Sequence, residues 1–338
     1  MKKILFTIIA LVIGFSAMPL SANAETITLT YSNFFPPTHV QSKLAQSWCD
    51  EVEKRTDGKV RVSYFPGGTL TKAKQCYDGV VEGISDIGLS ALAYSRGRFP
   101  TMAAVDLPLG YKSGAAATKV ANEVFEKFTP KEFDDVAPMY FHAHGPGLLF
   151  TAKNQVTTLE DINGLKLRGT GNSGKLIKTL GGAPVAMSMP DSYQAIRKGV
   201  VSGGMYPMES NKGWKMAEVV DYCTLDFPVA YTTTFFVVMN KNKWNSIPAD
   251  LQKIITEINQ EWAVKHGQAW DESDAAGKEF FVSKGGKFIT MSESEGNIWK
   301  EKASPMMTEY IKKTDSKGLN GKEILDFTVS SLAKCNSK

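Results

Sequence analysis

The first part of the chain alternates between a strand-like and a helix-like pattern of apolar residues. Apolar and polar positions alternate over 27–31 and again over 59–64, which is typical of strands with one buried face. Residues 40–55 form an amphipathic helical pattern that ends at Thr56-Asp57-Gly58, and a helix over 71–82 precedes a strand at 86–90. This order predicts a parallel sheet covered by helices on both faces.

A second set of strands and helices follows, and the chain then becomes wholly helical. One polar and apolar pattern of helical period runs without a break from Pro248 to about Ser283. The other predicted elements are strands at 136–142, 165–168, 185–188 and 232–239, and helices at 172–180, 191–198, about 292–313 and 322–334. With 338 residues, 43% of them apolar, the chain is long enough for two packed α/β domains, whose sheet ends are expected to face each other across a cleft.

The N-terminus has the features of an export signal. Lys2 and Lys3 precede an apolar run over 4–15, and an A-x-A pattern predicts cleavage after Ala24. The run is too short for a membrane span of about 20 residues. A lipid anchor is not expected either, because the predicted cleavage point has no cysteine. We therefore expect a periplasmic protein in a Gram-negative bacterium. Without the two leader lysines, 37 basic residues stand against 35 acidic ones, so no nucleic-acid or membrane-surface partner is expected.

The four cysteines favour disulfides in such an oxidising compartment. Cys49, Cys76, Cys223 and Cys335 contain no C-x-x-C pair, and the sequence alone permits three pairings. Cys49 and Cys76 lie on consecutive predicted helices, which favours a bridge between them. A second bridge would join Cys223 and Cys335.

The stretch LRGTGNSGKL at 167–176 has two glycine patterns that occur in nucleotide sites. Gly169, Gly171 and Gly174 have G-x-G-x-x-G spacing, but the position after Lys175 is a leucine, where a P-loop needs Ser or Thr for Mg²⁺. The nearest acidic residue for a ribose, Asp191, lies at a predicted helix start. Because the periplasm holds no ATP or NAD pool, we expect a strand-to-helix turn and no cofactor.

Arg168 stands at the end of a predicted strand, beside the start of the next helix. Guanidinium offers a planar fork for a carboxylate, and the free N–H groups of a helix start favour an anion at the same place. On chemistry alone, a surface arginine paired with a nearby glutamate is an equal alternative.

The order of motifs along the chain resembles that of TRAP-transporter solute-binding proteins of the DctP type. The resemblance begins with WCDEVEKRTDGKVRVSYFPGGTL and YDGVVEGISDIG within 48–88 and continues with LEDINGLKLR at 159–168. It goes on through 190–203, Val-Val-Met-Asn at 237–240 and the stretch that starts at Trp244, so it covers almost the whole mature chain. It implies a two-domain periplasmic-binding-protein architecture whose lobes are bridged by the long helix.

The resemblance also implies roles for individual residues. The arginine that ends G-L-K-L-R in the family holds the ligand carboxylate, and here it is Arg168. The segment that usually reads G-Q-E-N-P is GGMYP at 203–207, so Tyr206 replaces an asparagine that often bonds the ligand. Leu148 replaces a second basic residue of the sialic-acid-binding members, and Thr234 aligns with a frequent contact position. These replacements favour a monocarboxylate with an aromatic or apolar body over a C4-dicarboxylate or a sugar acid.

Four further candidates come from their places after strands. Phe34 and Phe35 follow the first strand, and Ser90 and Tyr94 follow the third, where ligands bind in such sheets. Aromatic residues there are also frequent core residues. Glu209 would bind an ammonium group if it pointed into the cleft, which would make the ligand an amino acid, whereas the alternative is a solvated residue at a helix start.

The chain carries no pattern that indicates catalysis or metal binding. His142 and His144 lie two apart, but no third ligand is evident, and neither G-x-S-x-G nor H-E-x-x-H occurs. We therefore expect a monomeric receptor, not an enzyme, that delivers an organic acid to TRAP membrane subunits. A binding protein of an ABC transporter is the alternative. The expected division is 1–24 leader, 25–151 with about 234–265 as the first domain, and 152–233 with about 266–338 as the second.

Overall fold

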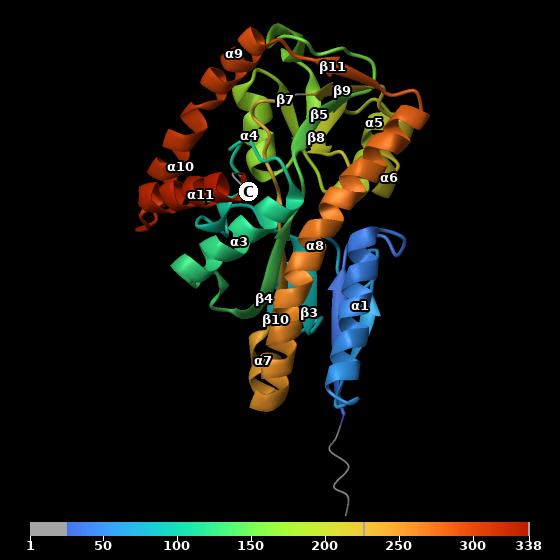
Figure 1. Ribbon diagram of the computed structural model, residues 1–338, viewed down its shortest axis with the longest axis vertical. Coiled ribbons are helices and arrows are strands. Elements are labelled where there is room, and N and C mark those ends of the chain that lie inside the picture. The colour runs from blue at the N-terminus through green and yellow to red at the C-terminus, as the bar shows by residue number, and fades with distance from the viewer. Residues whose placement is uncertain (1–25, 226, 337–338) are drawn as a thin grey trace, which may run out of the picture.

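The protein consists of two sheets that lie one above the other, with a long helix running along both (Figure 1). The computed structural model describes residues 26–225 and 227–336, so the expected leader and its cleavage point lie outside the described residues. We call each sheet with its helices a lobe. Among the described residues, no helix combines the length and the apolar character that crossing a membrane requires.

The first lobe is built on a five-stranded sheet in the order β2-β1-β3-β10-β4. The strands are β1 (Ile27–Asn33), β2 (Val60–Phe65), β3 (Ile87–Ala91), β4 (Val136–Ala143) and β10 (Thr234–Asn240). β1 pairs in parallel with β2 and β3, whereas β10 is antiparallel to both β3 and β4. Every side chain from Thr234 to Met239 is buried, because both faces of this central strand are covered by helices.

Two helices cover each face of this sheet. The core on one face joins Val237 with α1 (Val40–Arg55) and the long helix α8 (Ala249–Ser283). The core on the other face joins Phe236 with α2 (Cys76–Val81) and α3 (Gly114–Phe128). Neighbouring residues of β10 thus enter different cores, as the alternation of side chains along a strand requires.

The second lobe is built on a six-stranded sheet in the order β11-β9-β5-β8-β6-β7. The strands are β5 (Gly147–Thr151), β6 (Lys166–Gly169), β7 (Ala183–Ala186), β8 (Gly203–Pro207), β9 (Tyr222–Leu225) and β11 (Lys287–Thr290). α4 (Gly171–Thr179), α5 (Met189–Arg197) and the short α6 (Ser210–Gly213) follow β6, β7 and β8. Separate cores lie on its two faces, so Met205 and Tyr206 of β8 pack on opposite sides.

The C-terminal part of the chain connects the lobes a second time. α7 (Lys241–Ser246) leads into α8, and α9 (Glu293–Ala303), α10 (Pro305–Asp315) and α11 (Gly321–Asn336) follow β11. α11 returns to the first lobe, where Phe327 packs edge-on against Phe128 of α3 with ring centroids 5.6 Å apart. The α/β class and the long helix predicted from the sequence are confirmed.

α8 lies close to both lobes because glycines remove side chains at the contact points. A Cβ atom at Gly277 would approach the carbonyl oxygen of Met208 to 2.3 Å, and one at Gly114 would meet Trp270 at 2.5 Å. Asp271 of α8 accepts hydrogen bonds from the backbone of the first lobe, at Gly114 N (2.5 Å) and Ala115 N (3.1 Å). Asp274 accepts one from Glu209 N of the second lobe at 2.7 Å.

The expected division into domains differs from this arrangement in two places. β5 pairs with β8 and β9, so the chain enters the second sheet at residue 147 and not after residue 151. The end of the chain belongs with the first lobe, since Leu332 of α11 is buried in the same core as α3. The cause of the first difference is that β5, Gly-Leu-Leu-Phe-Thr, lacks the alternation that would have identified it as a strand.

The prediction of disulfide bridges at Cys49–Cys76 and Cys223–Cys335 is wrong. Cys49, Cys76 and Cys223 are unbridged and buried. Cys49 lies in the core beneath α1, and Cys76 lies in the core on the opposite face. The strand order explains this separation, because the connection from β1 to β2 runs outward and that from β2 to β3 runs back, so right-handed crossovers place α1 and α2 on opposite faces. Burial raises the pKa of the Cys76 thiol to about 12.

Candidate functional site

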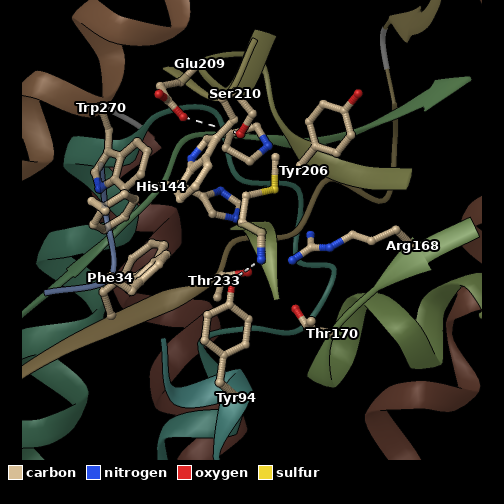
Figure 2. Close-up of a pocket in the computed structure, with 15 residues that line it drawn as sticks. Phe34, Tyr94, His144, Arg168, Thr170, Tyr206, Glu209, Ser210, Thr233 and Trp270 are labelled. Carbon is tan, nitrogen blue, oxygen red and sulfur yellow. Dashed lines mark hydrogen bonds between the residues drawn. The ribbon is translucent and has the colours of Figure 1, made fainter. Parts of the chain in front are cut away.

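A small cavity lies between the two lobes, at the ends of β1, β6 and β8 (Figure 2). Its empty volume is about 390 Å³. Residues of both lobes and of α8 line it: Phe34, Phe35, Tyr94, His144, Arg168, Thr170, Met189, Tyr206, Pro207, Glu209, Ser210, Trp214, Thr233, Phe235 and Trp270.

Arg168 brings a buried positive charge into this cavity without a carboxylate to balance it. It comes from β6 and is 5% exposed. Its Nε donates to the carbonyl oxygen of Met187 (3.2 Å) and one Nη donates to that of Met205 (3.0 Å). None of the ion pairs among the described residues includes it. A buried charge held only by carbonyl dipoles is costly unless an anion joins it, so the guanidinium, which points into the cavity in Figure 2, marks a site for a negative group.

Aromatic rings form the wall opposite Arg168. Phe34 lies nearly parallel to Trp214, with ring centroids 6.0 Å apart, and meets Tyr94 edge-on at 5.7 Å. Trp270 of α8 lies nearly parallel to Phe235, with centroids 5.4 Å apart. Phe34 and Trp214 belong to different lobes, so the aromatic wall is complete only when the lobes are together. Such a wall suits a flat apolar body.

Tyr94 holds the two lobes together at the edge of the cavity. Its hydroxyl oxygen, on the first lobe, accepts a hydrogen bond of 2.9 Å from Met189 N of the second lobe. Burial raises the pKa of Tyr94, and the positive charge of Arg168 opposes that rise. The ring is therefore neutral at physiological pH, and its oxygen lies near the guanidinium.

A cluster of polar groups lies at another end of the cavity. Glu209 is 2% exposed, and its Oε1 lies 2.8 Å from Nε2 of His39, although the two groups are not aligned as a hydrogen bond. Nδ1 of His39 accepts a hydrogen bond from Gln41 N (3.2 Å). Ser210 Oγ donates to Oε2 of Glu209 at 3.3 Å.

Asp274 stands behind Glu209 and is a neutral acid at physiological pH. The pKa of Asp274 is raised to about 8, mainly by burial; the hydrogen bond from Glu209 N opposes the rise, and the charges of Glu209 and Asp271 contribute to it. Among the described residues, Glu209 is the one acidic side chain in the lining.

His144 adds no charge to the cavity. Burial lowers its pKa to about 4, with a smaller contribution from the positive charge of Arg168, while its contact with the Gly145 carbonyl oxygen opposes the shift. Among the lining residues that the structure describes, Arg168 is accordingly the one cation. Within residues 26–225 and 227–336, no group of three His, Cys, Asp or Glu side chains is arranged to hold a metal ion.

The structure brings five of the seven predicted site residues to this cavity and keeps two away from it. Arg168, Phe34, Tyr94, Tyr206 and Glu209 are in the lining, as is Phe35. Ser90 and Thr234 are not: Ser90 Oγ donates to the carbonyl oxygen of Ala73 (2.7 Å), and Thr234 Oγ1 donates to Asp106 (2.7 Å). Thr233, the neighbour of Thr234, lines the cavity instead.

Tyr206 contributes to the lining mainly as an apolar surface. Its ring stacks on Phe150 inside the second lobe, with centroids 4.4 Å apart and planes 3° from parallel. Its hydroxyl is buried without a hydrogen-bond partner and points away from Arg168 in Figure 2. Leu148, the other replaced position, lies outside the lining.

Trp214 and Trp270 are the important lining residues that the sequence analysis missed. Trp270 lies within the long helical pattern. Because it is far in sequence from the strand ends that line the cavity, the sequence did not indicate that it contributes to the site. His39, the partner of Glu209, lies at the N-terminus of α1 and carries no motif. Only the position of Trp214 shortly after β8 could have indicated its role, because ligands bind in the loops that follow the strands of such a sheet.

Comparison with known proteins identifies relatives along nearly the whole chain. The family model described as "Bacterial extracellular solute-binding protein, family 7" matches residues 31–314. A TRAP periplasmic solute-binding protein from Desulfovibrio salexigens, solved in an open form with the C-terminus of a symmetry mate in its ligand site, is 33% identical with a TM-score of 0.80, over 91% of this chain and 96% of that one. A TRAP solute-binding protein from Rhodoferax ferrireducens, with copurified benzoate, is 28% identical with a TM-score of 0.87, over 92% and 99%. The C4-dicarboxylate-binding periplasmic protein DctP of Rhodobacter capsulatus is 26% identical over 88% of this chain and 90% of its own.

Proposed function

Because this chain belongs to family 7 of the bacterial extracellular solute-binding proteins, we propose that it is the periplasmic receptor of a TRAP transporter for a monocarboxylate with an aromatic or apolar body. The observation that carries the proposal is the buried guanidinium of Arg168, which forms no ion pair with a carboxylate of the described residues and faces an aromatic wall. In this role Arg168 binds the carboxylate, and Phe34, Trp214 and Trp270 enclose the apolar body.

The charges of the lining distinguish a monocarboxylate from a dicarboxylate. Arg168 balances one carboxylate, but a second one at the far end would meet the carboxyl group of Glu209. Two carboxylates a few ångströms apart in a buried site repel each other, and the remaining lining is largely aromatic. This argues against succinate, although DctP of Rhodobacter capsulatus is named for C4-dicarboxylates. The benzoate found in the Rhodoferax ferrireducens protein agrees with an aromatic acid.

An amino acid is the second candidate, and Glu209 is the observation that favours it. Its carboxylate is in the cavity lining and would attract an ammonium group. Against this, Oε1 already lies against His39 and Oε2 accepts from Ser210, which leaves little of the carboxylate unpartnered.

A panel of ligands separates these proposals. The mature protein would be mixed with benzoate, 3-hydroxybenzoate, mandelate, phenylalanine, succinate and glucuronate, and its unfolding temperature measured. We expect a rise with at least one aromatic acid, since a ligand at 100 times its Kd adds about 2.7 kcal/mol to the unfolding free energy. A rise with succinate or glucuronate alone would overturn the ligand class. Recovery of the ligand unchanged after incubation is expected of a receptor, whereas a product would indicate an enzyme.

A further inference from the structure

A second, larger groove opens beside the ligand cavity and shares Tyr94 and Thr170 with it. Its empty volume is about 1770 Å³, and it is formed by the segment after β3, the start of α4, the end of β7 and α10. Both lobes thus contribute walls. Six cationic side chains line it: Lys74, Arg96, Lys175, Lys178, Lys313 and Lys317.

The lining of the groove carries an excess of positive charge, although Glu309 lies near Lys175 and Glu132 lies near Lys317. The whole chain carries 39 basic and 35 acidic residues, yet the groove has six basic residues and, among its lining, one acid, Asp106. Burial raises the pKa of Asp106 to about 7, and its carboxylate accepts hydrogen bonds from Thr234. None of the six cations takes part in an ion pair among the described residues.

The effect of this crowding is visible at Lys175, the most buried of the six. Its ammonium group donates to Asn172 Oδ1 (3.0 Å). Burial lowers the pKa of Lys175, and the charges of Lys313 and Arg96 lower it further, while Glu309 on α10 opposes them. The cations therefore repel each other, and an anion in the groove would relieve that repulsion.

The glycine loop of the sequence forms the floor of this groove. Gly169, Gly171 and Gly174 all line it. Gly171 has a φ of +51°, and a Cβ atom there would stand 3.0 Å from that of Ala93 on the other lobe, so glycine permits the close approach of the lobes at this point. The start of α4, where backbone dipoles favour negative charge, thus faces the groove next to the Arg168 site.

We propose that this groove is an anion-collecting vestibule, in which the cations of both lobes attract a carboxylate from solution and guide it to Arg168. The proposal rests on the proposed function, since it takes the same organic acid as its ligand. A cleft lined by one sign of charge focuses the electric field and raises the association rate of an oppositely charged ligand, and this effect disappears at high ionic strength. The vestibule should therefore change the rate of binding far more than the rate of release.

The test compares two double variants of equal charge. Lys178→Gln with Lys313→Gln removes two groove cations that are exposed and take part in no ion pair among the described residues. Lys253→Gln with Lys300→Gln removes two exposed lysines of α8 and α9 that do not line the groove. Stopped-flow fluorescence of Trp214 and Trp270 would report binding of the acid in the panel with the lowest Kd.

For the groove variant we expect an association rate constant about three- to tenfold lower at roughly 20 mM salt and nearly equal to wild type at about 1 M, where the Debye length falls to about 3 Å. The dissociation rate should stay within about twofold, and the control variant should resemble wild type. An unchanged association rate, a loss that persists at about 1 M salt, or an equal loss in the control would each overturn the vestibule and leave the receptor proposal intact. If no acid of the panel binds the wild type, the proposed function itself fails.

Discussion

Replacing Arg168 is the sharpest test of the ligand site, because this residue performs two tasks at once. Nε and one Nη hold the backbone carbonyls of Met187 and Met205, which fixes the plane of the guanidinium. The rest of the fork faces the cavity. In Arg168→Ala both tasks are lost. In Arg168→Lys a single ammonium group cannot bind the two carbonyls and the ligand carboxylate with the geometry of the guanidinium.

The expected loss follows from the burial of the site. A charge-assisted hydrogen bond is roughly twice as strong as a neutral one, and leaving a buried carboxylate without its partner costs more than the bond alone. We expect Arg168→Ala to weaken binding of the best acid by about 2–4 kcal/mol, which is about 30- to 1000-fold in Kd. Arg168→Lys should recover only part of this loss, since the planar fork is not reproduced.

Isothermal titration calorimetry at pH 7 measures these constants directly. The matched control is Arg197→Ala, which removes an exposed arginine of α5 in the same lobe that is outside the cavity lining. Its Kd should equal that of the wild type. The unfolding temperature of each ligand-free variant should be recorded as well, so that a folding defect is not mistaken for a binding defect.

The reasoning would be refuted by a loss of less than threefold in Arg168→Ala with a folded protein. Equal affinity of Arg168→Lys and the wild type would refute the fork geometry alone and leave a role for the charge. Equal losses in Arg168→Ala and the Arg197→Ala control would indicate an effect of net charge on an anionic ligand.

Two further predictions concern stability and redox state. Because burial raises the pKa of Asp274 to about 8, the native protein binds one proton more than the unfolded chain between about pH 4 and pH 8, so this group makes stability fall as pH rises through that window. Asp274→Asn should therefore gain stability relative to wild type between pH 5 and pH 8.5 in urea unfolding, and parallel pH profiles would contradict this. Cys49, Cys76 and Cys223 should all react with iodoacetamide after denaturation without reductant, and a disulfide-linked peptide in the mass spectrum would show the structure to be wrong there.

Elements with a strong local pattern were predictable from the sequence. The helix over 40–55 has the bounds of α1, and the pattern from 248 to 283 corresponds to α8, because each helix buries one apolar stripe along its length. β5, β8, β9 and β11 escaped prediction, and β11 interrupts the part of the chain that was expected to be wholly helical. The first three are short strands in the middle of a sheet, and the glycines of β8 admit close contacts, such as Gly203 with the Phe150 carbonyl, that no periodicity records.

The same difference between local patterns and long-range packing applies to the residues of the candidate site. Arg168 was identifiable because its place depends on a strand end and the helix after it, which are adjacent in the sequence. Trp270 and the pairing of His39 with Glu209 depend on how distant segments pack, so one sequence does not reveal them. Thr233 and Thr234 show how fine the distinction is, because a shift of one residue along a strand turns the side chain to the other face.

The two aspartates of α8 lie within one turn of helix and bind opposite lobes, so a separation of the lobes about α8 would move the parts of the cavity wall unequally. Asp271 is bonded to the first lobe and Asp274 to the second, and three residues of helix rise about 4.5 Å. A rotation about so short a pivot displaces each group in proportion to its distance from α8. In such a rotation we expect Trp270, which lies on the helix and stacks on Phe235, to shift little, and Trp214 to depart from Phe34 of the opposite lobe. The two indoles would thus report different events: Trp270 the binding of a ring beside it, and Trp214 the approach of one lobe to the other.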